Sequence, residues 1–172
     1  MNKKLQFLWY GIGVAVLVVL DQWLKIWSIA NLKGQPPRNL ISGFIQLTYL
    51  ENTGAAFGFL SNFGGAQWLL AGYKLVVLVV AIAYFVKLPG EPRFTLLRVP
   101  LALIIAGGIG NLIDRVRFGF VVDMLEFEFV RFPVFNLADV YVTTGICAFA
   151  LFVLFVVKDA PLFGVKEKEA AT

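Results

Sequence analysis

Asp123 and Asp139 are the two residues of this sequence whose positions best suit acid–base chemistry. Each lies where an apolar segment meets a polar one, and the chain contains no histidine. Without an imidazole, Ser-His-Asp sites, Cys-His sites and histidine zinc sites are excluded. A pair of carboxylates remains, because neighbouring like charges let one group ionise while the other keeps its proton. The sequence therefore predicts carboxylate chemistry that uses no metal and no other cofactor.

Asp139 also has a purely structural interpretation. Residues 136–139 read Asn-Leu-Ala-Asp, and Asn at the N-cap with Asp three positions later is a good helix start. On the residues alone this explanation weighs as much as a chemical role, and the two are compatible, since a helix N-terminus favours an ionised carboxylate. Asp123 lies between apolar neighbours and has no such local explanation, which makes it the stronger functional candidate.

The composition indicates a polytopic membrane protein. Of the 172 residues, 59% are hydrophobic and only 15% are charged, whereas soluble domains carry about 25% charged residues. Four apolar stretches reach the ~20 residues that a helix needs to cross ~30 Å of hydrocarbon. They cover about residues 5–29, 65–86, 94–113 and 135–157. We expect the first to be retained, because it is too long for a signal peptide and lacks a small-x-small cleavage site.

The connections of about residues 30–64 and 115–133 are expected to lie on one side of the membrane. Residues 45–49 alternate apolar and polar side chains, the period of a half-buried strand, and 118–124 and 127–132 could supply further strands. Residues 55–60 are apolar but too few to span, which favours a surface or partly re-entrant element. The predicted fold is thus an all-α polytopic membrane protein with a small β-rich element and a short surface helix outside. Residues 1–172 would form a single membrane-embedded domain.

The net charge of +4 reflects the expected topology. Eight lysines and arginines lie on the side of both termini, against six on the other side. This modest excess favours cytoplasmic termini, because positively charged loops are retained in the cytoplasm. A nucleic-acid partner is not expected, since the basic residues are distributed by membrane side.

Most of the unusual polar residues fall on the outer side. Ionisable groups at membrane depth are costly, so their clustering marks a functional cavity. Asp21 and Lys25 share a helix face and suit either an interfacial ion pair or the support of a site, with neither favoured. Asn111 and Arg115 also share a face, which suits a structural brace or a substrate clamp. Lys74, inside the second span, is expected to extend toward the interface.

Five motifs lie in a diagnostic order along nearly the whole chain. They are Asp21-Gln22-x-x-Lys25, Asn52-Thr53-Gly54-Ala55-Ala56-Phe57-Gly58, Gly107-Gly108-Ile109-Gly110-Asn111-Leu112-Ile113-Asp114-Arg115, Val122-Asp123-Met124 and Phe135-Asn136-Leu137-Ala138-Asp139. Each is weak alone, but together they make the chain resemble the lipoprotein signal peptidases, the bacterial signal peptidase II family that removes signal peptides from lipid-modified prolipoproteins. Ala106 stands where the family usually has another glycine, a small-for-small change.

The resemblance implies an aspartic endopeptidase with Asp123 and Asp139 as its catalytic dyad, cutting just before a diacylglyceryl-modified cysteine. It implies a multi-pass protein of the bacterial cytoplasmic (inner) membrane, with both termini cytoplasmic and the active site facing outward. Membrane lipid and globomycin-type inhibitors are the expected partners, and we expect a monomer. The expected substrate-binding or supporting residues are Asp21, Lys25, Asn52, Gly54, Asn111, Arg115, Asn136 and Ala138.

On this interpretation the two aspartates share one proton and hold a water molecule. The ionised partner takes a proton from the water, and the protonated partner donates to the scissile carbonyl. The sequence does not assign the proton, because a coupled pair titrates as a unit, although the helix start near Asp139 suggests that it is the more acidic partner. Two other classes stay open: a transporter or proton-conducting subunit, in which carboxylates relay ions, and a noncatalytic scaffold, which leaves Asp123 without a role.

Overall fold

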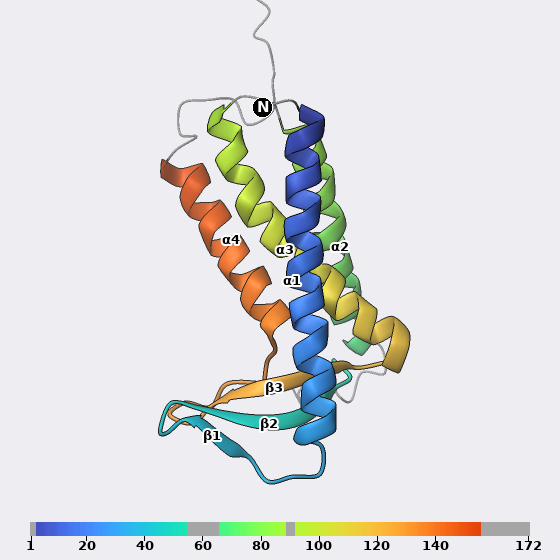
Figure 1. The fold of residues 1–172 in the computed structure, drawn as a ribbon, viewed down its shortest axis with the longest axis vertical. Coiled ribbons are helices and arrows are strands. Elements are labelled where there is room, and N and C mark those ends of the chain that lie inside the picture. Colours follow the sequence, from blue (N-terminus) through green and yellow to red (C-terminus); the bar gives the residue numbers. More distant parts are fainter. Residues whose placement is uncertain (1–2, 55–65, 89–91, 156–172) are drawn as a thin grey trace, which may run out of the picture.

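Four long helices stand side by side, and a small sheet closes one end of the bundle (Figure 1). The computed structural model describes residues 3–54, 66–88 and 92–155. The helices are α1 (Lys3–Asn31), α2 (Ala66–Lys87), α3 (Pro92–Phe118) and α4 (Leu137–Phe155). They lie at the four apolar stretches of the sequence, because such stretches satisfy their backbone groups internally only as helices.

Three of these helices are long and apolar enough to cross a membrane. Within the described part of the chain, the qualifying segments are Lys4–Asn31, Leu96–Phe118 and Leu137–Phe155. Helix α2, with 22 residues, occupies the place of the expected second span. Its passage through the membrane stays a prediction.

Helix α3 extends further than the sequence analysis placed it. The third span was expected to end at residue 113, yet the helix continues to Phe118 and so includes Asp114 and Arg115. Gly119 ends it, with a positive φ of 79° and its N–H bonded to the carbonyl of Arg115 at 3.0 Å. A glycine in the left-handed conformation is a common helix terminator, because it carries no Cβ to clash.

The sheet has three antiparallel strands in the order β1-β2-β3. They are β1 (Arg38–Ile41), β2 (Ile45–Asn52) and β3 (Val121–Phe127). The predicted strand at 45–49 is confirmed, and the one predicted at 118–124 begins three residues later, because α3 occupies its start. The register pairs Leu50 with Asp123 and Asn52 with Val121, which brings the end of β2 beside the start of β3.

The strand predicted at 127–132 is wrong. After Phe127 the chain bends, and Phe135 then pairs with Leu125 through bonds of 2.8 and 2.9 Å in both directions. Residues 128–134 therefore form no strand, and only Phe135 returns to pair with β3. The short surface element expected at 55–60 lies outside the described residues.

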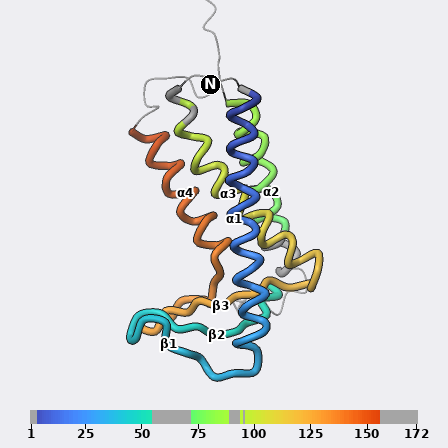
Figure 2. Tube along the Cα trace, in the orientation of Figure 1, coloured from blue at the N-terminus to red at the C-terminus, as the bar shows by residue number. Residues whose placement is uncertain are grey.

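Two apolar clusters hold the structure together. One lies between the helices and includes Leu78, Phe85 and Leu97, and the other, formed by Leu32, Val122 and Met124, joins the end of α1 to β3. Figure 2 follows the trace from β3 through a short connection into α4, whose first turn starts close to the sheet. The polar residues singled out in the sequence lie between these two clusters, where α3, α4 and β3 meet.

Helices α3 and α4 approach closely through glycines. A Cβ on Gly145 would lie 2.7 Å from both Ile104 Cγ1 and the Pro100 carbonyl oxygen, and a Cβ on Gly107 would meet the backbone of Ala138. Small residues permit this approach between membrane helices. The first turn of α4 therefore rests directly on α3.

Candidate active site

The first turn of α4 is fixed by reciprocal capping. The Asp139 N–H donates to Asn136 Oδ1 at 2.9 Å, and the Asn136 N–H donates to Asp139 Oδ2 at 3.4 Å. This is the geometry of a capping box, which satisfies two helix N–H groups at once. The structural interpretation of Asp139 is therefore confirmed. The cap uses Asp139 Oδ2 and leaves Oδ1 available to other donors.

Asp139 Oδ1 accepts two further donors. Asn111 Nδ2 on α3 lies at 3.0 Å, and Lys74 Nζ on α2 lies at 3.2 Å. The Lys74 and Asp139 side chains are 45% and 26% exposed. Sequence analysis missed this partner of Lys74, because nothing in the local pattern of α2 indicates what its ammonium reaches.

Asp123 lies on β3 and is fully buried. Its Oδ1 accepts a bond of 2.6 Å from Asn136 Nδ2, and its Oδ2 accepts one of 2.7 Å from Asn52 Nδ2. The Asn136 side chain thus joins the two aspartates, since its oxygen caps Asp139 while its amino group holds Asp123. Burial raises the pKa of Asp123 to about 6, an effect that the bonds from Asn52 and Asn136 oppose and the charge of Asp139 reinforces.

Asn52 is held in place by a local turn at the end of β2. Its Oδ1 accepts a bond of 2.8 Å from the Gly54 N–H, and Gly54 has a positive φ of 90°. Such a turn is typical of Asn, and the positive φ favours glycine at the following position. The Asn-x-Gly pattern therefore aims the amino group of Asn52 at Asp123.

A buried ionic cluster lies behind this pair. Lys25 Nζ contacts Asp21 Oδ2 at 3.0 Å, Asp114 Oδ2 at 2.9 Å and Asn111 Oδ1 at 3.0 Å. The side chains of Lys25, Asp21 and Asp114 are at most 1% exposed, so Asp21 and Lys25 do not form a water-exposed pair. Buried charges need such complete partnering, because water no longer solvates them.

The ionic cluster reaches two other elements, α4 and β3, through backbone bonds. Asp21 Oδ1 accepts the N–H of Ala138 in the first turn of α4 at 3.0 Å, and Asp114 Oδ2 accepts the N–H of Val122 on β3 at 3.0 Å. Gln22 Nε2 adds a bond of 2.9 Å to Asp114 Oδ1. Gln22 and Asp114 were in the motifs but not among the expected site residues. Their presence in the motifs was the available signal.

Arg115 lies one turn beyond Asn111 on α3, as its spacing indicated. Its Nη1 is 3.4 Å from the Asn111 carbonyl oxygen, and its charge interacts with those of Asp139 and Asp123. A guanidinium retains several donors for a further carboxylate or carbonyl. Its place at the cavity suits a substrate contact.

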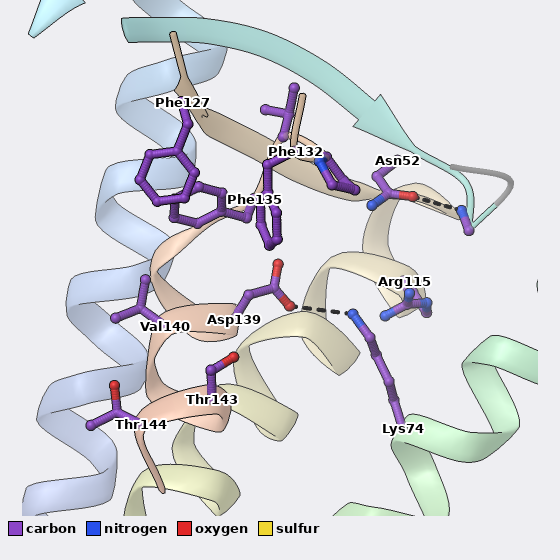
Figure 3. A pocket seen from close by; sticks show the side chains of 13 residues that line it. Asn52, Lys74, Arg115, Phe127, Phe132, Phe135, Asp139, Val140, Thr143 and Thr144 are labelled. Carbon is purple, nitrogen blue, oxygen red and sulfur yellow. Dashed lines mark hydrogen bonds and ion pairs between the residues drawn. The ribbon is translucent and has the colours of Figure 1, made fainter. Parts of the chain in front are cut away.

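A cavity of about 430 Å³ opens beside Asp139 (Figure 3). Apolar side chains make most of its wall, and the polar lining groups gather around the carboxylate. The lining residues are Asn52, Gly54, Lys74, Arg115, Phe127, Phe132, Pro133, Val134, Phe135, Asp139, Val140, Thr143 and Thr144. Asp123 is fully buried and is not among them. Among the described residues, no group of three or more His, Cys, Asp or Glu side chains could hold a metal ion.

Long apolar helices, an apolar cavity beside Asp139 of α4, and a second carboxylate on β3 that Asn136 links to it together fit a membrane-embedded enzyme. The family described as signal peptidase (SPase) II matches residues 13–155. The chain belongs to this family, as its motifs predicted, and is a protease. Membership sets aside the transporter and scaffold interpretations.

Several curated relatives are lipoprotein signal peptidases of bacteria. That of Streptococcus thermophilus (strain CNRZ 1066) is 42% identical over 135 residues, which cover 78% of this chain and 85% of the relative. That of Streptococcus pyogenes serotype M6 is 38% identical over 147 residues, covering 85% and 90%. That of Lactococcus lactis subsp. cremoris is 40% identical over 132 residues, covering 77% and 84%.

Solved structures share the fold. A bacterial membrane enzyme determined by the in meso method at 2.3 Å resolution matches with a TM-score of 0.66 and 27% identity, over 95% of this chain and 93% of that chain. A second bacterial membrane enzyme, at 1.9 Å resolution, matches with a TM-score of 0.67 and 26% identity, over 86% and 93%.

Proposed function

We propose that this protein removes signal peptides from diacylglyceryl-modified prolipoproteins, cutting just before the lipidated cysteine, with Asp123 and Asp139 as its catalytic pair. The observation that carries the proposal is the Asn136 side chain, which is bonded at 2.6 Å to Asp123 and at 2.9 Å to the backbone of Asp139. This side chain links one acid from β3 to one from α4. Two coupled carboxylates are sufficient to activate water for peptide hydrolysis.

In the proposed reaction, the ionised carboxylate takes a proton from water as the water oxygen attacks the scissile carbonyl. The protonated carboxylate donates its proton to the carbonyl oxygen, and the tetrahedral intermediate then expels the amine, which takes up a proton. Both oxygens of Asp123 are occupied by amides in this structure. The mechanism therefore requires Asp123 to exchange its bond with Asn52 for one to substrate or water during turnover.

The cavity gives the proposed substrate its place. Phe127, Phe132 and Phe135 form an apolar wall on one side of Asp139 (Figure 3), which suits an acyl chain or an apolar signal-peptide side chain. Arg115 and Asn52 lie at the polar part of the lining and suit the carbonyl groups of an extended peptide. Asp21, Lys25, Asn111 and Ala138 would support the pair through the ionic cluster.

We further propose that all four helices, α2 included, cross the bacterial cytoplasmic membrane with the sheet outside. Helix α1 begins and α4 ends at the end of the bundle opposite the sheet (Figure 1), and the basic residues favour that end as cytoplasmic. The site would then face outward, at the depth where a lipid-anchored precursor presents its cleavage site. The working form would be a single-domain monomer, open to inhibition by globomycin-type compounds.

The test uses the purified full-length protein and one precursor in lipid-modified and unmodified forms. We expect release of the signal fragment only from the lipid-modified precursor. Asp123→Asn and Asp139→Asn should each abolish release while leaving the helical content and thermal unfolding close to those of the parent. Turnover retained in either folded variant would refute the catalytic pair, and equal cleavage of both precursors would refute the substrate assignment.

A further inference from the structure

Lys74 is the charged residue of α2 that lies away from the helix ends. The only other charged residue of this 22-residue helix, Lys87, occupies its last turn. A lysine within an apolar helix is costly at membrane depth, and such residues usually mark a functional site. The family motifs do not include Lys74, and the proposed mechanism has not used it.

The Lys74 ammonium ends at the proposed catalytic pair. Its Nζ lies 3.2 Å from Asp139 Oδ1, the oxygen that the helix cap leaves outside. Its side chain rises from α2 toward the cavity (Figure 3) and also lines a smaller cavity of about 60 Å³ beside Asn111. Helix α2 therefore contributes a charge to a site that is otherwise built by α3, α4 and the sheet.

The two carboxylates have unequal surroundings. Asp139 faces Lys74 from α2, Arg115 from α3 and Asp123 from β3, and it caps a helix N-terminus, which itself favours negative charge. Asp123 is fully buried and bonded to two neutral amides, and the charges of Lys74 and Arg115 act on it only from a distance, since no Lys or Arg of the described residues forms an ion pair with it. On α1, Lys25 and Asp21 lie behind Asn111, partnered with each other and with Asp114 of α3.

We propose that Lys74 is a positioning residue that holds Asp139 as the ionised partner, so that Asp123 keeps the shared proton. This inference rests on the proposed function. Asp139 then acts as the base that takes a proton from water, and Asp123 is the acid that donates to the carbonyl oxygen. When the C–N bond breaks, the amine takes the proton held by Asp139, and re-formation of the carbonyl returns the other proton to Asp123. The different surroundings of the two aspartates thus make Asp139 the base and Asp123 the acid.

If Lys74 had a purely structural role, its loss would change the stability of the protein and not the pH dependence of cleavage. The pair is 45% and 26% exposed, and an ion pair so open to solvent contributes little to folding. Its charge acts instead on the neighbouring carboxylate, because the ionised form of Asp139 is favoured by a cation at contact distance. The pH dependence and the salt dependence of the cleavage rate therefore distinguish the electrostatic role of Lys74 from a structural one.

The experiment compares pH–rate profiles of the full-length parent, Lys74→Met and Lys74→Arg, with a diacylglyceryl-modified precursor peptide as substrate. The rate at low pH requires the proposed base to be charged, and Lys74→Met removes the ammonium that lies 3.2 Å from Asp139 Oδ1 and attracts that charge. The acidic limb of Lys74→Met should therefore move to higher pH by roughly 0.2 to 0.7 units, and Lys74→Arg should restore it. Lys87→Met, the same change at the far end of α2, should leave the profile in place.

Salt gives a second measurement that needs no variant. About 1 M salt screens exposed charges within a few ångströms, so it should move the acidic limb of the parent toward that of Lys74→Met. The limb of Lys74→Met should move less, because Arg115 is still beside Asp139 but Lys74 is gone. An acidic limb that is unchanged in Lys74→Met, or in the parent at high salt if that variant does not fold, overturns the inference. The proposed function is judged separately, because it fails only if folded Asp123→Asn or Asp139→Asn still cleaves.

Discussion

Asn136 is the residue on which the geometry of the site depends most directly. It caps α4 through its oxygen and holds Asp123 through its amino group. The same short side chain therefore stabilises the start of α4 and links the two acids. Few residue types suit both tasks, since serine and aspartate can cap a helix but offer no amino group.

This double role predicts a separation of stability from activity. Asn136→Ala should lose the cap, at a cost of about 0.5–2 kcal/mol, and should also lose most cleavage. Asn136→Ser should recover much of the stability, because serine is a good cap, but not the activity, because it cannot donate to Asp123 in the same way. Thermal unfolding and the cleavage rate measure the two effects, and a serine variant with parental turnover would contradict the role of the amino group.

At the scale of elements, the buried ionic cluster explains how α1, α3, α4 and β3 keep their relative positions. Lys25 and Asp21 come from α1, Asp114 from α3, and their carboxylates accept backbone N–H groups of α4 and β3. The contacts from Lys25 to Asp114 and from Ala138 to Asp21 join elements that are far apart in sequence. Helix α4 and strand β3, which carry the two proposed catalytic acids, are thereby tied to the same lysine.

Removal of Lys25 should consequently be severe. Lys25→Met leaves two buried carboxylates without their cation, which typically costs about 3–5 kcal/mol, and cleavage should fall with the loss of alignment. Lys33→Met, which breaks the exposed pair between Lys33 and Glu51, is the matched control and should change the unfolding temperature little. Equal unfolding temperatures for the two variants would show that the cluster does not brace the elements.

Along the bundle axis, the apolar part of the molecule is separate from the part that holds the proposed active site. The apolar helices occupy most of its length, and the sheet, the cavity and the linked acids lie at one end (Figure 1). This arrangement suits a site at a membrane surface, because the polar groups avoid the hydrocarbon core while the walls of the cavity stay apolar. Hydrolysis at such a site has access to water.

The proposed orientation predicts which positions a membrane-impermeant thiol reagent can reach in intact cells. Cys147 is the only cysteine, so a Cys147→Ser background allows single cysteines to be introduced. Asn39→Cys, on β1, should be labelled from outside, whereas Lys87→Cys, at the opposite end of α2, should be labelled only after the membrane is opened. Labelling of both positions from outside would contradict α2 as a span.

Local sequence patterns predicted much of this fold because they reflect local physics. Apolar stretches of sufficient length placed all four helices, and the alternation at 45–49 placed β2. Strand β1 was not predicted, since its four exposed residues show no alternation of burial. The strand predicted at 127–132 is wrong because the chain bends after Phe127 and pairs with Leu125 only at Phe135, a contact that no local pattern encodes.

The sequence by itself determined the family, the candidate acids and the helix cap at Asn136, because motifs and caps depend on residues that are close along the chain. Only the tertiary structure decided that Lys25 pairs with Asp114 and that Lys74, 65 residues before Asp139, ends on its carboxylate. The physical reason is that such contacts depend on how helices pack and which faces they turn to each other. Helix periodicity indicates which residues share a helix face, but the packing of the whole bundle determines which faces contact each other.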